Sequence, residues 1–80
     1  MGYSNSFLAT MSKSMTTKEF DEFLSPVLNV SNILDEGDQI TTHVCGDKAE
    51  LNFFTRRDIT LEEVEYCLIG NTVTAIEKAE

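Results

Sequence analysis

Hydrophobic and polar residues alternate through the middle of the chain, between residues 39 and 54, on both sides of a Gly46-Asp47 pair. Alternation with a period of two is typical of strands, and a two-residue loop that begins with glycine is typical of a β-hairpin. With that loop, Cys45 faces Lys48 and the remaining pairs follow outward. One face of the hairpin is then mostly apolar and carries the pairs Val44/Ala49, Thr42/Leu51 and Ile40/Phe53. The other face is mostly polar and carries the pairs His43/Glu50, Thr41/Asn52 and Gln39/Phe54.

A helix is predicted to begin at Thr17. Thr16 and Glu19 have the spacing of a capping box, in which each side chain bonds the backbone N–H of the other residue. Met15 and Phe20 have the spacing of the hydrophobic staple that accompanies such a box. The apolar positions at helical spacing are Phe20, Phe23, Leu24, Val27, Leu28, Val30 and Leu34.

Pro26 interrupts this periodic segment. A proline inside a helix removes one backbone donor and crowds the preceding turn, whereas Ser25 followed by Pro26 also makes a good helix start. The sequence therefore predicts either one kinked helix or two short helices in series. The segment is predicted to end at residues 35–38, with Gly37 as a C-terminal cap or a turn residue.

A second helix is predicted after Thr60, because Glu63 completes another capping box and Ile59 and Val64 another staple. On a helical wheel Leu61, Val64 and Leu68 face inward, with Cys67 on the flank. The outward positions are Glu62, Glu63 and Tyr66, with Glu65 at their edge. The pair Gly70-Asn71 is predicted to end this helix.

Two further strands are predicted, one from Phe7 to Met11 and one from Thr72 to Ile76. Residues 1–6 are expected to form a flexible N-terminus, residues 7–80 a single domain, and residues 77–80 a frayed end. The order β-α-β-β-α-β predicts an α+β fold of the ferredoxin-like sandwich type, an antiparallel sheet with both helices on one face. Without the first strand the order α-β-β-α-β is still that of an α+β domain.

The net charge of the chain limits the functions that this domain can have. The 80 residues contain 14 acids and 6 bases, a formal net charge of −8. The negative charge is concentrated at residues 17–38 and 59–80, the two stretches that contain the predicted helices. A surface of this sign disfavours direct nucleic-acid binding, which relies on Lys and Arg at phosphates, and suits solubility or a basic protein partner.

Candidate catalytic chemistry is limited to His43 and Cys45, which lie two residues apart on the polar face of the hairpin. A thiol–imidazole pair needs a third group to orient it, and none is evident. Two cysteines and one histidine are too few for a zinc site, and no glycine-rich phosphate loop is present. We therefore expect neither an enzyme nor a bound metal or cofactor. No apolar run approaches the length of a membrane span, and we expect a cytoplasmic protein with reduced thiols.

Two surfaces are candidates for binding another protein. The acidic helix face consists of Glu62, Glu63, Glu65 and Tyr66. The open sheet face consists of His43, Glu50, Asn52 and Phe54, which Leu8 and Ile76 would join if their strands take the required phase. Carboxylates spaced along a helix can imitate phosphates toward a basic groove, and an exposed apolar patch suits a homodimer or a partner.

The order hairpin, helix, Gly70-Asn71-Thr72-Val73 and strand resembles the C-terminal part of the small phage inhibitors of uracil-DNA glycosylase, which mimic DNA. We expect a non-catalytic acidic module of the phage-inhibitor type, anti-defence or anti-CRISPR, that occupies the basic surface of a nucleic-acid-handling protein. In that case it acts in the host cytoplasm. The alternatives are a structural or regulatory subunit that self-associates through the open sheet face and, more remotely, a Cys/His enzyme.

Overall fold

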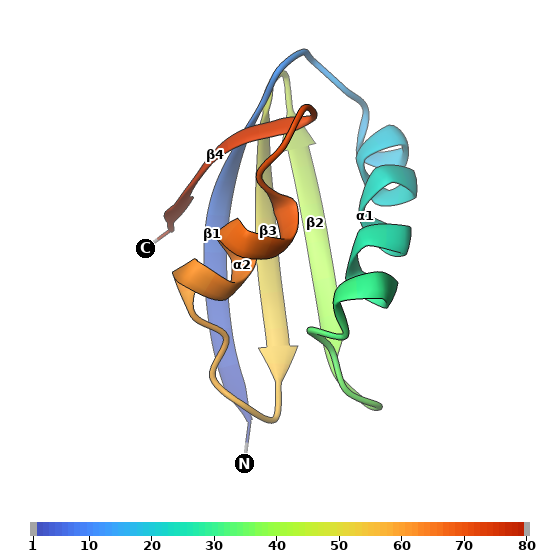
Figure 1. Ribbon diagram of the computed structural model, residues 1–80. Coiled ribbons are helices and arrows are strands. Elements are labelled where there is room, and N and C mark those ends of the chain that lie inside the picture. The colour runs from blue at the N-terminus through green and yellow to red at the C-terminus, as the bar shows by residue number, and fades with distance from the viewer. Residues whose placement is uncertain (1, 80) are drawn as a thin grey trace.

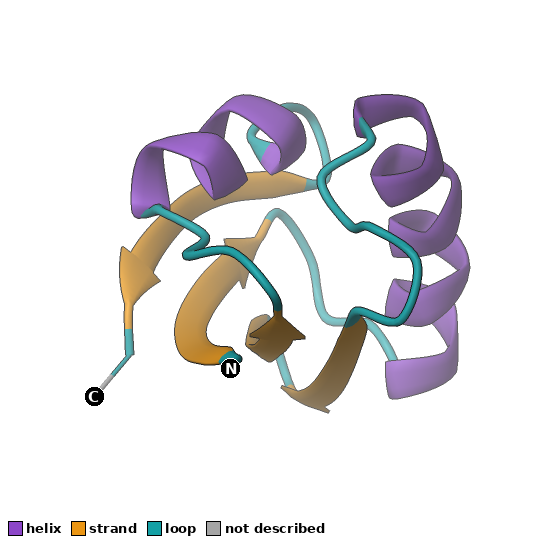
Figure 2. Cartoon of the chain, turned by 90° about the horizontal axis from the view of Figure 1, so that it is seen from below, coloured by secondary structure: helices purple, strands orange, loops and turns teal. Residues whose placement is uncertain are grey.

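The computed structural model describes residues 2–79. In chain order the elements are β1 (Tyr3–Met11), α1 (Thr17–Ser31), β2 (Gln39–Cys45), β3 (Lys48–Thr55), α2 (Leu61–Leu68) and β4 (Val73–Lys78). Antiparallel pairing joins the strands in the order β2-β3-β1-β4, so β2 and β4 are the edge strands (Figure 1). Both helices lie on the same side of the curved sheet (Figure 2). The predicted α+β fold and its element order are confirmed.

The predicted hairpin register is confirmed pair by pair, from Cys45 with Lys48 to Gln39 with Phe54. Gly46 has a φ of 64°, and Asp47 follows it with a negative φ, which is the pattern of a type II′ turn. The strand side chains alternate as the pleat requires. On β3 the inward residues are Ala49, Leu51 and Phe53, all fully buried.

The core fills the space between the sheet and the helices. Phe7 on β1 and Phe53 on β3 meet edge to face, with ring centroids 5.7 Å apart and an interplanar angle of 79°. This geometry is favourable for aromatic pairs. From the helices Phe20, Leu24, Leu28, Val64 and Leu68 complete the core.

β1 is longer than predicted, because it begins at Tyr3 rather than at Phe7. Residues 3–6, which the sequence placed in a flexible terminus, pair with β3. The reason is that their polar side chains find partners: Asn5 Nδ2 donates to Asp58 Oδ1 at 2.9 Å, and Ser6 Oγ donates to Asn52 Oδ1 at 2.6 Å. Met1, also assigned to that terminus, lies outside the described residues.

α1 is one helix with Pro26 inside it, so the prediction of two helices in series is wrong. Pro26 and Glu22 are both exposed, and water can bond the Glu22 carbonyl that the missing N–H leaves free. The helix ends at Ser31 because Asn32 takes a left-handed conformation, with a φ of 56°. Gly37, with a φ of 90°, is a turn residue and not the cap of this helix.

The early end of α1 changes which apolar residues are buried. Val30, predicted to face the core, is 87 % exposed, and Ile33 beyond the cap is buried instead. β4 also differs from its prediction, since it covers Val73–Lys78 and its pairing with β1 shifts register between Thr10 and Met11. The shift places Ile76 beside Ala9 in the core, so its predicted position on the open sheet face is wrong. The last residue of the predicted frayed end, Glu80, lies outside the described residues.

Candidate functional site

The open sheet face brings together the four residues predicted for it. His43 pairs with Glu50 across the hairpin, and the Asn52 amide nitrogen lies 3.5 Å from Glu50 Oε1. Phe54 is 46 % exposed at one end of this face. Leu8 is the other large apolar residue there, and it is paired with Glu50. Because Asn52 and its β1 neighbour separate Leu8 from Phe54, the face carries single apolar residues and no continuous patch.

His43 and Cys45 are both exposed on this same face, each beside a charged residue of β3. Glu50 lies opposite His43, and Lys48 lies opposite Cys45. Lys48 donates to Thr10 Oγ1 at 2.8 Å, toward β1. Within residues 2–79 no group of three or more His, Cys, Asp or Glu side chains is placed to hold a metal ion.

The acidic helix face is built by the capping box that begins α2. Thr60 Oγ1 accepts from the Glu63 backbone N–H at 3.3 Å, and Glu63 Oε1 accepts from the Thr60 backbone N–H at 3.2 Å. The second carboxylate oxygen of Glu63 is 2.6 Å from Arg57 Nη1. Arg57 also donates to the Ile33 carbonyl at 3.2 Å. Glu63 is thus engaged in holding the start of α2 to the rest of the chain.

These contacts make the contribution of Glu63 to folding stability depend on pH. Hydrogen bonds from Arg57 and from the Thr60 backbone hold the pKa of Glu63 below its ordinary value of 4.5. A lowered folded-state pKa means that the carboxylate contributes stability above pH 4.5 and loses it as the pH falls through the lowered value. Glu19 in the equivalent box of α1 has its pKa lowered by Thr16 in the same direction.

Glu63→Gln is expected to lower the free energy of unfolding at neutral pH by about 0.5–1 kcal/mol, the scale of one cap bond and one exposed ion pair. The difference from the unaltered protein should close as the pH falls through the lowered pKa of Glu63. Urea unfolding across this pH range measures both effects. A constant difference at every pH would contradict the assignment, and Glu62→Gln, one residue along the helix, is the control.

The rest of the acidic helix face points to solvent. Tyr66 is 93 % exposed, Glu62 is exposed and Glu65 is half-buried. Within residues 2–79 the Arg57–Glu63 contact is the single ion pair, so Glu62 and Glu65 have no cationic partner there. Tyr66 also borders a shallow groove of about 560 Å³ between the helices, which the sequence did not reveal. The other groove residues are Pro26, Val27, Val30, Ser31 and Cys67.

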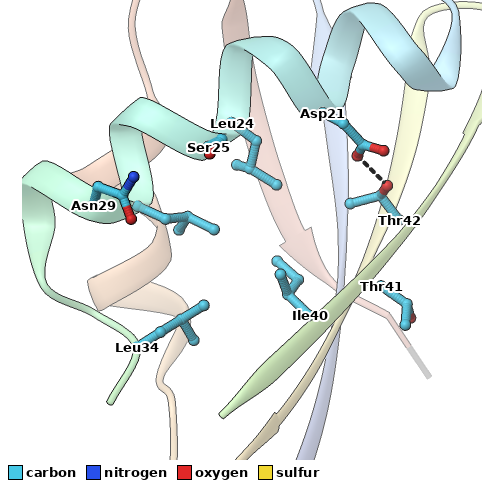
Figure 3. A pocket seen from close by; sticks show the side chains of 9 residues that line it. Asp21, Leu24, Ser25, Asn29, Leu34, Ile40, Thr41 and Thr42 are labelled. Atoms are coloured by element: carbon cyan, nitrogen blue, oxygen red, sulfur yellow. Dashed lines mark hydrogen bonds between the residues drawn. The ribbon is translucent and has the colours of Figure 1, made fainter. Parts of the chain in front are cut away.

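A second groove, of about 470 Å³, lies between α1 and the edge strand β2 (Figure 3). Figure 3 shows Leu24, Leu34 and Ile40 pointing into it. At one end Thr42 Oγ1 donates to Asp21 Oδ1 at 2.5 Å. The remaining lining residues are Ser25, Leu28, Asn29 and Thr41. In the sequence, the polar spacing Asp21, Ser25, Asn29 beside Leu24 and Leu28 is the one local signal of this groove.

The net charge is distributed unevenly between sheet and helices. The four strands carry no net charge, since Lys48 and Lys78 offset Glu50 and Glu77. The excess of carboxylates therefore lies on the helices and the connections. No helix within residues 2–79 has the length and hydrophobicity needed to cross a membrane.

No protein-family model, curated protein or solved structure matches the chain. The surfaces described above, and the chemistry of their side chains, are the basis of the functional proposals that follow.

Proposed function

We propose that the protein is a non-catalytic acidic module that binds the basic, nucleic-acid-contacting surface of another protein. The observation that carries the proposal is the exposed face of α2. Glu62 and Glu65 have no cationic partner within the described residues, and they flank Tyr66, which is 93 % exposed. Helix α2 is anchored at its start by the capping box and by Arg57, so these side chains are presented from a rigid element.

Such a face fits a basic groove for two physical reasons. Carboxylates take the place of phosphates opposite Lys and Arg side chains, and a net charge of −8 accelerates the approach of a cationic surface. An exposed tyrosine supplies contact area at a small entropy cost, as in many interface centres. Small phage-encoded inhibitors of host defence, anti-CRISPR proteins among them, have this size and charge, and we assign the protein to that functional type, acting in the cytoplasm.

We also propose that the architecture is a ferredoxin-like sandwich. Support comes from the two crossover units, each split by one strand: β3 lies between the parallel strands β1 and β2, and β1 lies between the parallel strands β3 and β4. This is the split β-α-β arrangement. It leaves the sheet face opposite the helices uncovered.

The test of the proposed function is capture of partners on the immobilised protein from extracts of its native host. The bound proteins should be nucleic-acid-handling enzymes, and they should be released by salt and by excess duplex DNA or single-stranded RNA. The protein alone should bind neither nucleic acid. Partners that stay bound in the presence of both competitors would contradict the proposal.

The surface is tested by a pair of nearly isosteric substitutions that remove two negative charges. Glu62→Gln with Glu65→Gln is expected to weaken binding to a captured partner by about tenfold at low salt, because two carboxylates opposite basic side chains are removed. The matched control is Glu50→Gln with Glu77→Gln on the open sheet face, which removes the same charge. Titration calorimetry at two salt concentrations measures the affinity of each double variant for the partner. Equal losses of affinity in the two variants would contradict an interface on α2.

A further inference from the structure

The outer side of β2 has unpaired backbone groups. β2 pairs with β3 alone, and the hairpin turn makes Cys45 and Lys48 a hydrogen-bonded pair. In an antiparallel ladder hydrogen-bonded pairs alternate with non-bonded ones, so the N–H and C=O groups of Ile40, Thr42 and Val44 point away from β3. No backbone partner for these groups is found within residues 2–79.

Three features that commonly protect a sheet edge, namely lysine, proline and a β-bulge, are missing from β2. α1 lies beside this edge but does not bond its outward backbone groups. β2 has the sequence Gln-Ile-Thr-Thr-His-Val-Cys, and its register runs through seven pairs without a shift. The opposite edge, β4, has a register shift against β1 and carries Glu77 and Lys78 near its end. One edge is therefore protected, and the other is free to pair.

The groove between α1 and β2 lies beside this free edge. α1 runs alongside β2 in both overall views (Figures 1 and 2). The two elements are bridged at Thr42 by its hydrogen bond to Asp21, while Leu34 and Ile40 stay half-buried in the groove (Figure 3). A strand added along β2 would place every second side chain in this groove, because side chains alternate across a strand. The half-buried apolar residues would then be covered.

Charge decides between the possible occupants of the groove. Asp21 lies at one end, and the other end, at Leu34, continues into the acidic loop Asp35, Glu36 and Asp38. No lysine or arginine is among the groove residues. A second copy pairing through the same edge would bring together like charges, two chains of −8 each. The complementary occupant is a cationic segment.

We propose that the free edge of β2 and the groove under α1 bind an extended, basic segment of a partner protein by strand addition, with apolar residues at alternate positions and Lys or Arg between them. Backbone hydrogen bonds to Ile40, Thr42 and Val44 provide the pairing. The apolar side chains of the bound segment pack on Leu24, Leu34 and Ile40. The inference rests on the basic partner of the proposed function but uses a different surface from α2.

Amide hydrogen exchange of the whole chain, followed residue by residue by NMR, tests the proposal with the peptide Lys-Val-Lys-Val-Lys-Val-Lys as probe. In the free protein the N–H groups of Ile40, Thr42 and Val44 should exchange fast, and those of Thr41 and His43 slowly. Saturating peptide should slow the three fast amides by about tenfold or more, since each becomes hydrogen-bonded. The control peptide Glu-Val-Glu-Val-Glu-Val-Glu should leave all five unchanged.

Asp21→Asn is expected to weaken the affinity for the basic peptide by about three- to fivefold, the effect of one partly exposed ion pair. Glu22→Gln, one residue along α1 and outside the groove, is the matched control and should change the affinity by less than about 1.5-fold. Both substitutions remove one negative charge. Equal effects would show attraction to the net charge alone and would overturn the assigned site.

Two further outcomes would overturn the proposal. Binding of the basic peptide without slower exchange at Ile40, Thr42 and Val44 excludes strand addition. Slow exchange of these amides in the free protein, dependent on its concentration, shows that a second copy occupies the edge. Peptide binding to the Glu62→Gln, Glu65→Gln double variant separates the two proposals: protection that persists there supports the β2 site even if α2 binds nothing.

Discussion

Replacing Phe53 with alanine is expected to lower the free energy of unfolding by about 3–5 kcal/mol. The side chain is fully buried in the inner strand β3 and packs edge to face on Phe7. Its loss leaves a cavity at the centre of the sheet. An 80-residue domain has a total stability of only about 4–12 kcal/mol, so a large part of it would be lost. Urea unfolding followed by circular dichroism measures the change.

The neighbouring Phe54 is the control for this substitution. It lies on the open sheet face, where it pairs with Gln39, and is 46 % exposed. Phe54→Ala is expected to cost less than about 1 kcal/mol, since exposed positions contribute little. Comparable losses at the two positions would contradict the register of the hairpin, because a slip by one residue exchanges the faces.

Asn5→Pro is expected to lower the free energy of unfolding by about 2–4 kcal/mol, through the loss of a ladder hydrogen bond and of the bond to Asp58. Asn5 is buried and pairs with Phe53, and its amide reaches Asp58 at 2.9 Å. The variant unfolds at lower urea if residues 3–6 are a strand, as the structure has them. A flexible terminus, as the sequence predicted, would tolerate the proline.

Ser14→Pro is the control for Asn5→Pro. Ser14 is exposed in the connection between β1 and α1 and belongs to neither element. The substitution should change the stability by less than about 0.5 kcal/mol. An equal loss at both positions would indicate a general effect of proline in this part of the chain and not the pairing of Asn5.

The elements predicted correctly from the sequence are those whose signals are local and agree with one another. The Gly46-Asp47 turn and the alternation around it specify the same register, and a slip would contradict both. The capping boxes at Thr16 and Thr60 likewise need only residues three positions apart. The start of α2, which carries the acidic helix face, could be predicted for the same reason.

The predictions that were wrong depend on partners distant in the chain. The strand character of Asn5 depends on Asp58, which no local pattern connects to it. The burial of Ile76 depends on a register shift against β1. The end of α1 had a local signal, because asparagine tolerates the left-handed conformation that Asn32 adopts, but the apolar spacing up to Leu34 outweighed it.

The role of Glu63 illustrates the same limit within the candidate site. Sequence spacing placed it both in the capping box and on the outward face of α2, and these assignments compete for one carboxylate. In the structure the Glu63 carboxylate is 2.6 Å from Arg57 Nη1, so it serves to hold the start of α2 in place. The groove beside β2 has almost no signal in the sequence, because it arises from the way α1 lies past the edge of the sheet.

The place of β1 in the sheet has a consequence for synthesis on the ribosome. β1 is made first, yet it is an inner strand, and its neighbours β3 and β4 come much later in the chain. Pairing of such distant segments is intrinsically slow. Until residues 73–78 have emerged, the nascent chain exposes the apolar side of β1 and an unpaired edge, both of which invite aggregation. Any delay in translation before the last strand would therefore prolong the exposure of β1.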